Sequence, residues 1–376
     1  MEIGIIGGGA FGLTASHDLS TRGADVTLFE RTKNGGENSR RAAGIVYDAY
    51  TDELDVQIAK RSIERFRKFD SETEFEFVQT PYVWGATQED EKSAKAIENQ
   101  ARKMLQLGLD VSVLDGSELE EEFPDINADD IEIGAVTHNS GRVKPEEYVG
   151  TMMRKVEKEG VEMKRGTKAG IDLEDTNPRV ITSNSTFYFD SVVVSAGAHT
   201  KKVLSNAGIG IAMKPYRVQA LVTQHDESLN VPMFYDATQG YYLRPYDNGV
   251  LAGDGSEKFE SDPDSWDPNP DTAFVKDLSR KLKSRLSDPT FEIKKAWAGL
   301  CTATPDKNPL LGEIRENVYV ATGWQGHGFM RSPGLSEILT EEVLDGQGIE
   351  EFSPDRFGGD EDFEIGEGME IEAQVD

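Results

Sequence analysis

Blocks of apolar and polar residues divide the chain into strands and helices from its N-terminus onward. Residues 2–6 form a short apolar strand, and residues 24–29 form a second one. Between them, residues 13–21 have the pattern of a helix, with Leu13 and Leu19 available to face a sheet. A strand, a glycine-rich turn, a helix and a strand in this order predict a right-handed βαβ unit.

The same patterning predicts further elements along the rest of the chain. Helices are expected over residues 52–69, 89–107, 145–159, 271–286 and 332–344. Strands are expected over residues 75–78, 82–85, 161–165, 180–182, 187–194, 214–224, 241–253 and 318–321. Residues 256–271 are rich in Asp, Pro and Ser and predict a loop, whereas the acidic segment from Phe357 predicts a loose tail.

Composition and charge exclude several classes of protein. The 376 residues carry 40 Lys and Arg against 69 Asp and Glu, a formal net charge of −29 at pH 7 that repels nucleic acid and anionic membranes. No apolar run is long enough for a transmembrane helix, and the N-terminus lacks the basic region of a signal peptide. A single cysteine excludes an internal disulfide and a cysteine-based zinc site, and no other metal site is predicted. We therefore expect a soluble, cytoplasmic protein with no nucleic-acid partner and no membrane span.

The acidic residues are scattered over the whole chain rather than gathered in one segment. A solvated acidic surface is the simplest interpretation of this pattern. The charge balance also resembles that of proteins from salt-in halophiles, which stay soluble in concentrated KCl through excess carboxylates. Self-repulsion would destabilise such a fold in dilute buffer. We expect a halophilic protein.

The turn after the first strand has the spacing Gly7-x-Gly9-x-x-Gly12. Gly7 permits the tight turn, Gly9 lets the backbone approach a pyrophosphate, and Gly12 lets the helix pack closely on the strand. The N-terminus of the helix then presents free N–H groups to the phosphates. Glu30 ends the second strand, where a carboxylate accepts hydrogen bonds from a ribose 2′-hydroxyl and disfavours a 2′-phosphate. The predicted dinucleotide site, which fits FAD and NAD equally, comprises Gly7, Gly9, Ala10, Phe11, Gly12, Glu30 and Arg31.

Four later segments decide between the two cofactors. Residues 39–44 read Ser-Arg-Arg-Ala-Ala-Gly, and residues 191–198 read Ser-Val-Val-Val-Ser-Ala-Gly-Ala. Residues 297–312 contain Trp-Ala-Gly-Leu and Thr-Pro-Asp-Lys-Asn-Pro-Leu-Leu-Gly, and residues 321–329 read Ala-Thr-Gly-Trp-Gln-Gly-His-Gly-Phe. With these motifs the chain resembles, over residues 1–357, the FAD-dependent amine and amino-acid oxidoreductases typified by D-amino-acid oxidase, glycine oxidase and sarcosine oxidase.

This resemblance implies that FAD is the cofactor. It implies that small residues in these segments line the flavin and the adenosine. It also implies that the glycine turn before residue 329 brings N–H groups to the flavin pyrimidine oxygen, where they stabilise negative charge on reduced flavin. The cofactor-binding residues implied in these segments are Ser39, Arg40, Ala43, Gly44, Ala196, Gly197, Gly323, Gly326, His327, Gly328 and Phe329.

The expected fold class is α/β (α+β), with a Rossmann-like FAD-binding domain on a parallel sheet, interleaved with an antiparallel-sheet substrate domain. The FAD-binding domain is expected to comprise residues 1–80, 140–210 and 296–357. The substrate domain is expected to comprise residues 81–139 and 211–295, and residues 358–376 are expected to form the acidic tail. The substrate would bind between the antiparallel sheet and the isoalloxazine ring, because pockets often occur at domain interfaces.

The resemblance also implies a substrate site on the hairpin of residues 241–253. An arginine can hold a carboxylate bidentately, and Arg244 is the first candidate for this anchor, although it could instead pair with the protein's own carboxylates. His327 would lie near the flavin and could tune it, bind substrate or only position the backbone. The predicted catalytic residues are Arg244, Tyr242 and His327. Further candidates are Arg331 and, more weakly, Arg217 for the carboxylate, and Tyr235 or Tyr241 for a hydroxyl or for packing.

Two positions depart from the family pattern. Cys301 stands where glycine-oxidase-like members carry an arginine that anchors the substrate carboxylate. Monomeric sarcosine oxidases bind flavin covalently through a cysteine in this segment, but with a longer spacing to the following Asp, so we expect a buried and unreactive Cys301. Leu251 stands where sarcosine oxidases carry a lysine that promotes reaction with oxygen. A dehydrogenase that passes electrons to another acceptor is therefore an open alternative.

These features favour an FAD-dependent oxidoreductase that oxidises the C–N bond of a small amino acid or N-methylated amino acid, of the D-amino acid, glycine, sarcosine or dimethylglycine type. Hydride would pass from the neutral amine to flavin N5, and water would hydrolyse the resulting imine. The expected partners are this substrate and oxygen or another electron acceptor. Two alternatives stay open: oxidation of a 2-hydroxy acid or glycerol 3-phosphate with His327 as the base, and a flavin subunit that only transfers electrons.

Overall fold

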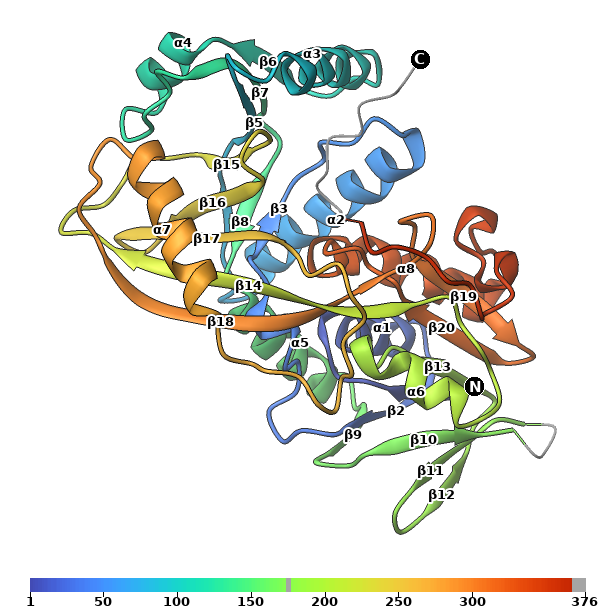
Figure 1. Cartoon of the computed structure of the whole chain (residues 1–376). Coiled ribbons are helices and arrows are strands. Elements are labelled where there is room, and N and C mark those ends of the chain that lie inside the picture. Colours follow the sequence, from blue (N-terminus) through green and yellow to red (C-terminus); the bar gives the residue numbers. More distant parts are fainter. Residues whose placement is uncertain (174–176, 367–376) are drawn as a thin grey trace.

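A mainly parallel sheet forms the centre of the half that contains the Gly7–Gly12 turn (Figure 1). The structure, a computed structural model, describes residues 1–173 and 177–366. In this sheet β1 pairs in parallel with β13 and β2, and the edge strand β19 runs antiparallel to β20. The strands, in spatial order, are β19 (Leu310–Arg315), β20 (Val318–Thr322), β13 (Ser191–Val194), β1 (Glu2–Ile6), β2 (Asp25–Glu30) and β9 (Glu162–Arg165).

Helices cover one face of this sheet and a small antiparallel sheet covers the other. Successive side chains of β13 point to opposite faces, so Val193 joins the helix-side core while Val192 and Val194 pack with the small sheet. The helices are α1 (Ala10–Thr21), α2 (Glu53–Glu72), α5 (Pro145–Lys158) and α8 (Gly328–Asp345), and the short helix α6 (Thr200–Ser205) follows β13. The small sheet comprises β10 (Ala169–Asp172), β11 (Arg179–Thr182) and β12 (Thr186–Tyr188). The order β1, α1, β2 confirms the predicted βαβ unit.

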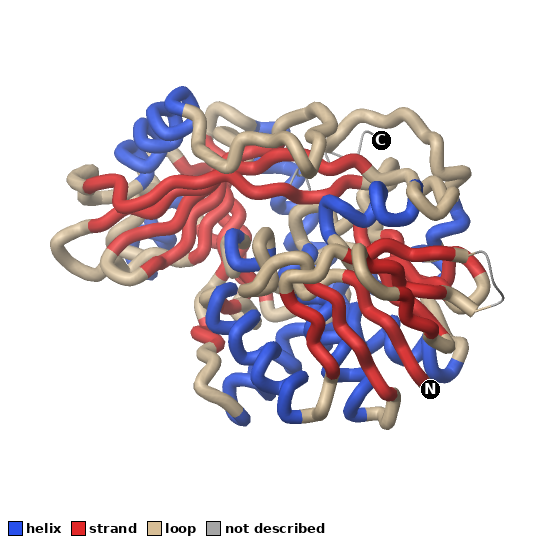
Figure 2. Tube along the Cα trace, turned by 90° about the horizontal axis from the view of Figure 1, so that it is seen from below, coloured by secondary structure: helices blue, strands red, loops and turns tan. Residues whose placement is uncertain are grey.

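A long, mostly antiparallel sheet builds the other half of the molecule and extends away from the parallel sheet (Figure 2). Its strands, in spatial order, are β18 (Glu292–Ala303), β14 (Lys214–Gln224), β17 (Gly249–Ser256), β16 (Tyr241–Tyr246), β15 (Met233–Asp236), β5 (Tyr82–Thr87), β7 (Ile131–Thr137) and β6 (Val111–Leu114). Its helices are α3 (Glu91–Gln106), α4 (Gly116–Glu122) and α7 (Thr272–Arg285). A third sheet of β3 (Ile45–Val46), β8 (Gly141–Val143) and β4 (Phe77–Gln79) completes the fold.

Several predicted element limits differ from the structure. The strand predicted over residues 187–194 is two strands, β12 and β13, and the strand predicted over residues 241–253 is the hairpin of β16 and β17. Asp247 adopts a left-handed φ of 48° in the turn of this hairpin. The pattern of apolar residues does not reveal this turn. β18 pairs with β14 along its whole length, so the antiparallel sheet reaches beyond the predicted domain limit at residue 295.

The helices of the described residues include none with the length and apolar character that a membrane crossing requires.

Residues 358–366 pack on the rest of the protein, so the prediction of a loose tail is wrong for this part. Ile365 is only 3% exposed and joins an apolar cluster with Tyr216 and Ala303. The Lys214 ammonium contacts Asp362 Oδ1 at 2.7 Å and donates to the carbonyl oxygen of Phe363 at 2.6 Å. The acidic composition of the segment hides these apolar anchors, and the rest of the predicted tail, residues 367–376, lies outside the described residues.

A buried ion pair joins α7 to the antiparallel sheet. Arg285 is 2% exposed, and its Nη2 lies 2.9 Å from Oδ2 of Asp236, which is fully buried. Arg285 Nη1 also contacts Asp130 Oδ1 at 2.6 Å. A buried charge that loses its partner is strongly destabilising, so this pair fixes where α7 lies on the sheet.

Substitution Arg285→Met should lower the free energy of unfolding by about 3–5 kcal/mol, because Asp236 then stays buried without its cation. Adding Asp236→Asn should recover part of this loss. The matched control is Arg280→Met, since Arg280 is exposed on the same helix and forms an exposed ion pair with Asp277; its cost should stay below about 1 kcal/mol. Denaturant unfolding of the three variants measures these differences. Equal losses for Arg285→Met and Arg280→Met would contradict the argument.

Candidate functional site

The Gly7–Gly12 turn brings α1 against β1 more closely than any side chain would permit. Gly7 has a φ of 118°, and a Cβ there would lie 2.3 Å from the carbonyl oxygen of Ser195. A Cβ on Gly12 would lie 1.9 Å from the carbonyl oxygen of Gly7. A Cβ on Gly9 would meet Ser39 Oγ at 3.1 Å, and Gly9 lines a cavity. Gly7 and Gly12 therefore serve close packing, whereas Gly9 leaves the helix N-terminus open to a ligand.

Glu30 is held firmly at the end of β2. One of its carboxylate oxygens accepts a hydrogen bond from the Gly8 N–H at 2.8 Å, and the other accepts from the Thr32 N–H at 2.7 Å. The side chain is 9% exposed and lines the same cavity. Next to it, the Arg31 guanidinium contacts Glu37 at 2.7 Å. This fixed carboxylate suits the hydroxyls of a ribose.

A cavity of about 620 Å³ runs from this turn to the antiparallel sheet, within the usual size range of ligand sites. The predicted residues that line it are Gly7, Gly9, Ala10, Phe11, Glu30, Arg31, Ser39, Ala43, Gly44, Ala196, Gly197, Tyr242, Gly326, His327, Gly328 and Phe329. The structure does not place Gly12, Arg40, Gly323 or Arg244 in this lining. Gly12 packs inside the turn, Gly323 has a φ of 75° that shapes the closing turn, and Arg40 donates to the carbonyl oxygens of residues 34 and 35.

The lining fits a flavin dinucleotide on two grounds. Gly7, Gly8 and Gly9, which have no Cβ, lead directly into the first turn of α1, whose leading N–H groups have no partners within the helix. At the other end, α8 begins at Gly328 directly after the closing turn, and Gly328 and Phe329 line the cavity. Two helix N-termini thus meet one elongated cavity, where they can stabilise negative charge on the phosphates and on the flavin.

The end of the cavity beside the antiparallel sheet is rich in aromatic side chains, and its charged lining residue from that sheet is Asp254 of β17. Tyr47, Tyr235, Tyr242 and His327 line it. Burial, with a smaller effect of nearby Arg331, lowers the pKa of His327 to about 3, so the imidazole is neutral at physiological pH. Burial also raises the pKa of Tyr242 above its ordinary value, so the phenol keeps its proton.

The three candidate arginines are committed to protein groups. The Arg244 guanidinium donates to the carbonyl oxygens of Ala43, Pro245 and Val143, and this arginine is 1% exposed. Arg331 Nη2 contacts Asp55 Oδ1 at 2.5 Å, while Arg217 pairs with Glu257 and Asp271. This placement argues against the prediction that Arg244 anchors a substrate carboxylate. Its donors instead hold the segment that contains Ala43, a contact between distant residues that the sequence does not reveal.

The cavity has a marked division of charge. Among the described residues its cationic lining consists of Arg31, Arg41, Lys168 and Lys202, and the strands of the antiparallel sheet contribute no lysine or arginine. Leu251 is 2% exposed and does not line the cavity. Cys301 does line it, and burial raises its pKa to about 11 although a hydrogen bond with Tyr216 lowers it, so the thiol stays protonated. No group of three metal-ligating side chains occurs in the described part of the chain.

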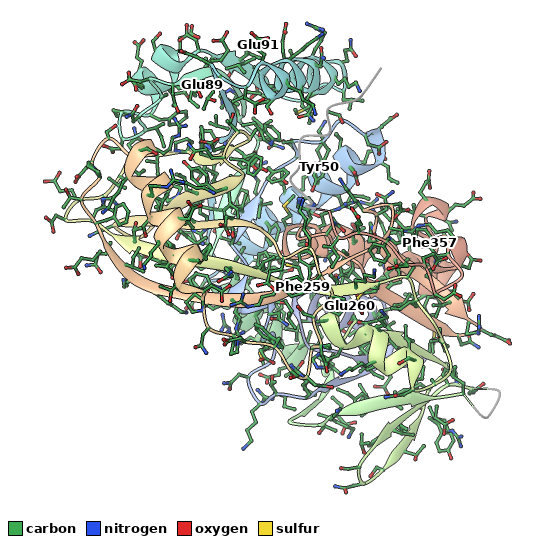
Figure 3. All side chains as sticks on the ribbon, viewed as in Figure 1. Tyr50, Glu89, Glu91, Phe259, Glu260 and Phe357 are labelled. Carbon is green, nitrogen blue, oxygen red and sulfur yellow. The ribbon has the colours of Figure 1, made fainter. Side chains whose placement is uncertain are left out.

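The loop predicted over residues 256–271 is an acidic strap, residues 257–271, that crosses from the antiparallel sheet to α6, and these contacts with α6 were not predicted. Figure 3 labels Phe259 and Glu260 on this segment. Glu260 contacts Lys201 at 2.7 Å, and Asp262 and Asp264 contact Lys202 at 2.5 and 2.7 Å.

The strap also reaches the cavity itself. Asp264 Oδ1 lies 3.0 Å from His199 Nε2, and His199, Lys202 and Asp264 line the cavity. Farther along, the Arg41 guanidinium lies 5.4 Å from the centre of the Trp266 ring. Ion pairs between residues so far apart cannot be predicted from the local sequence, which shows only an excess of Asp in a loop. The strap therefore closes one side of the expected dinucleotide site.

Loss of a strap contact should speed the release of FAD, the cofactor that the resemblance implies. We expect Asp262→Asn, which removes a Lys202 partner outside the cavity lining, to raise the FAD dissociation constant up to about 5-fold, as befits an exposed ion pair. Flavin fluorescence after dilution measures this effect. The control Glu162→Gln removes a similar pair with Lys164 away from the cavity, and an equal effect there would refute the strap's role.

Comparisons with known proteins agree with this geometry. A monomeric sarcosine oxidase from Bacillus sp. (strain B-0618) is 25% identical over 368 residues, which cover 92% of this chain and 93% of that protein. The crystal structure of L-proline dehydrogenase from P. horikoshii is 28% identical, with a TM-score of 0.87 over 95% of this chain and 97% of that one. Glycine oxidase from Geobacillus kaustophilus shares the fold at a TM-score of 0.85 and 21% identity, covering 94% and 98% of the two chains. The model of the DAO family, FAD dependent oxidoreductase, matches residues 2–342, and the chain belongs to this family of FAD-dependent enzymes.

Proposed function

We propose that this FAD-dependent oxidoreductase oxidises the C–N bond of a small amino acid whose nitrogen is a secondary amine, as in sarcosine or proline. The carrying observation is the aromatic end of the cavity, where Tyr47, Tyr235, Tyr242 and His327 meet. This end suits a small substrate with a short apolar body, and among the described residues it has no lysine or arginine to bind a larger anion. The names of the sarcosine oxidase and the L-proline dehydrogenase support a secondary amine, with glycine and D-amino acids as the other substrates to test.

The residues of this end can prepare the substrate for oxidation. FAD, when bound, would accept the hydride from the carbon next to the amine nitrogen, so that the C–N single bond becomes the C=N bond of the imine. The substrate amine must be neutral to release hydride, and the aromatic walls favour this form because they desolvate the amine. The N–H groups at the start of α8 supply a positive field at the closing turn. The imine product needs only water for its hydrolysis, so no dedicated general base is required.

Oxidation of a C–O bond fits the site less well. That reaction requires a base to take the hydroxyl proton. His327 is the candidate, but a pKa lowered to about 3 makes it a weak base. A phosphate substrate would also need cations, whereas those in the described lining belong to the nucleotide-binding half. A flavin subunit that only transfers electrons would not need the enclosed aromatic end, so this end argues against that alternative.

The electron acceptor is proposed to be a molecule other than oxygen. A cation near the flavin promotes the reaction of reduced flavin with oxygen by stabilising the superoxide-like charge that develops. The antiparallel sheet places no lysine or arginine in the described lining, and Leu251 is buried outside it. This arrangement supports a dehydrogenase rather than an oxidase.

Anaerobic bleaching of the flavin band tests the proposed reaction. The purified protein, kept in molar KCl because of its net charge of −29, should be bleached by sarcosine or L-proline faster than by glycine, D-alanine or lactate. The rate should rise with pH as the substrate amine loses its proton, and His327 should add no limb between pH 5 and 8 because its pKa is about 3.

Two further results of this experiment are decisive. Air admitted to the bleached enzyme should restore the colour slowly, and an artificial acceptor dye should restore it quickly. Bleaching by lactate or glycerol 3-phosphate alone would overturn C–N oxidation, whereas fast recolouring in air would overturn only the choice of dehydrogenase.

Substitution Arg244→Met should affect cofactor retention rather than substrate affinity. The variant loses the donors to the carbonyl oxygens of Ala43 and Val143, so FAD affinity and thermal stability should fall, each lost hydrogen bond costing about 1 kcal/mol. The KM of FAD-saturated enzyme for the amino acid should change less than about 3-fold, since Arg244 does not line the cavity. Steady-state kinetics with excess FAD provide the measurement. A rise in KM of about 100-fold or more, as expected on losing a charged carboxylate anchor, would restore Arg244 to that role.

A further inference from the structure

Tyr47 and His327 form a hydrogen-bonded pair inside the aromatic end of the cavity. Tyr47 Oη lies 2.9 Å from His327 Nε2, and both residues line the cavity. Tyr47 belongs to the segment after β3, whereas His327 precedes α8, so two distant parts of the chain meet here. The described lining of this end contains no arginine, so this pair is the polar contact there that best suits binding of a substrate carboxylate.

Packing fixes the position of the Tyr47 hydroxyl. The Tyr47 ring stacks on Tyr82 with ring centres 4.4 Å apart and planes inclined by only 5°. Tyr50 and Trp84 flank it at ring-centre distances of 5.6 and 6.1 Å. Tyr47 is 5% exposed, so its ring has little room to swing. The hydroxyl therefore presents one defined hydrogen-bond partner to His327.

Hydrogen-bond chemistry then selects one tautomer of His327. The imidazole is neutral, so one ring nitrogen accepts and the other carries the proton. A neutral imidazole nitrogen is a better acceptor than a phenol oxygen, so Tyr47 donates to Nε2 and the proton resides on Nδ1. Nδ1 has no hydrogen-bond partner among the residues that the structure describes, while the histidine itself lines the cavity. The result is an N–H donor at the substrate end.

We propose that His327 Nδ1–H binds the substrate carboxylate and that Tyr47 is the positioning residue that holds His327 in this tautomer. This inference rests on the proposed function, because it assigns the carboxylate of the amino acid to a neutral donor. A hydrogen bond to an ionised acceptor is about twice as strong as a neutral one, so such a donor still distinguishes a carboxylate from an amide. The three candidate arginines, in contrast, are already paired within the protein.

Binding of an unreactive ligand tests this assignment without turnover. Pyrrole-2-carboxylate resembles proline but has no Cα–H to lose, and pyrrole-2-carboxamide is its uncharged counterpart. Each is titrated into the FAD-loaded enzyme while the flavin absorbance is followed. Tyr47→Phe should weaken the carboxylate about 5- to 10-fold and the carboxamide much less. With substrate, the same variant should raise KM by a similar factor and lower kcat by less.

Two further variants separate positioning from general damage. Tyr148→Phe removes a buried phenol that bonds Thr14 at 2.8 Å and does not itself line the cavity, and it should leave both ligands unaffected because the ring that packs on Phe329 is kept. His327→Phe should weaken the carboxylate at least as much as Tyr47→Phe, and adding Tyr47→Phe to it should have no further effect, because the two act as one unit.

The outcomes separate this inference from the function on which it rests. Unchanged carboxylate binding in Tyr47→Phe, or an equal loss in Tyr148→Phe, would overturn the role of the pair while bleaching by amino acids still upheld the proposed function. A wild-type enzyme that binds neither pyrrole and is bleached by no amino acid would overturn both.

Discussion

The close contact of α1 with β1 at Gly7 and Gly12 is the constraint on which the site depends. Because no Cβ intervenes, the first turn of the helix lies directly above the ends of β1 and β13. That position lets the Gly8 N–H reach Glu30 and the Ala10 N–H reach Ser39 Oγ, at 2.8 and 2.9 Å. One steric requirement thus aligns the ribose carboxylate, the pyrophosphate turn and the segment that leads toward the flavin.

The sequence predicted the parts of this arrangement that follow from local rules. The βαβ unit and the closing turn before α8 depend on glycine spacing and apolar periodicity, which are visible in a single chain. The partners of Arg244 were not predictable, because its acceptors are backbone carbonyls that any residue can offer. The packing of Ile365 and the contacts of the acidic strap with α6 were missed for a related reason. Charge dominates their composition, whereas their position depends on a few contacts with distant residues.

Charge is distributed along the cavity according to what each end must bind. The nucleotide end holds cations beside the carboxylates of Glu30 and Asp264, which suits a ligand with phosphates and hydroxyls. The other end keeps neutral donors among aromatic rings. A zwitterionic amino acid has no net charge, so a protein of charge −29 does not repel it as it would a phosphate ester. The division of charge therefore favours an amino acid over an anion before any specific contact forms.

Desolvation at the aromatic end favours the neutral amine without an arginine in the described lining. An arginine beside the substrate would bind the carboxylate more tightly, and its positive charge would also shift the pKa of each titratable group nearby. Arg331 already lowers the pKa of His327, although it is paired with Asp55. With that guanidinium outside the cavity lining, its charge supports a neutral imidazole without contacting the substrate directly. The fold thereby keeps a hydrogen-bond donor at the substrate while both the histidine and the aromatic walls leave the amine free to lose its proton.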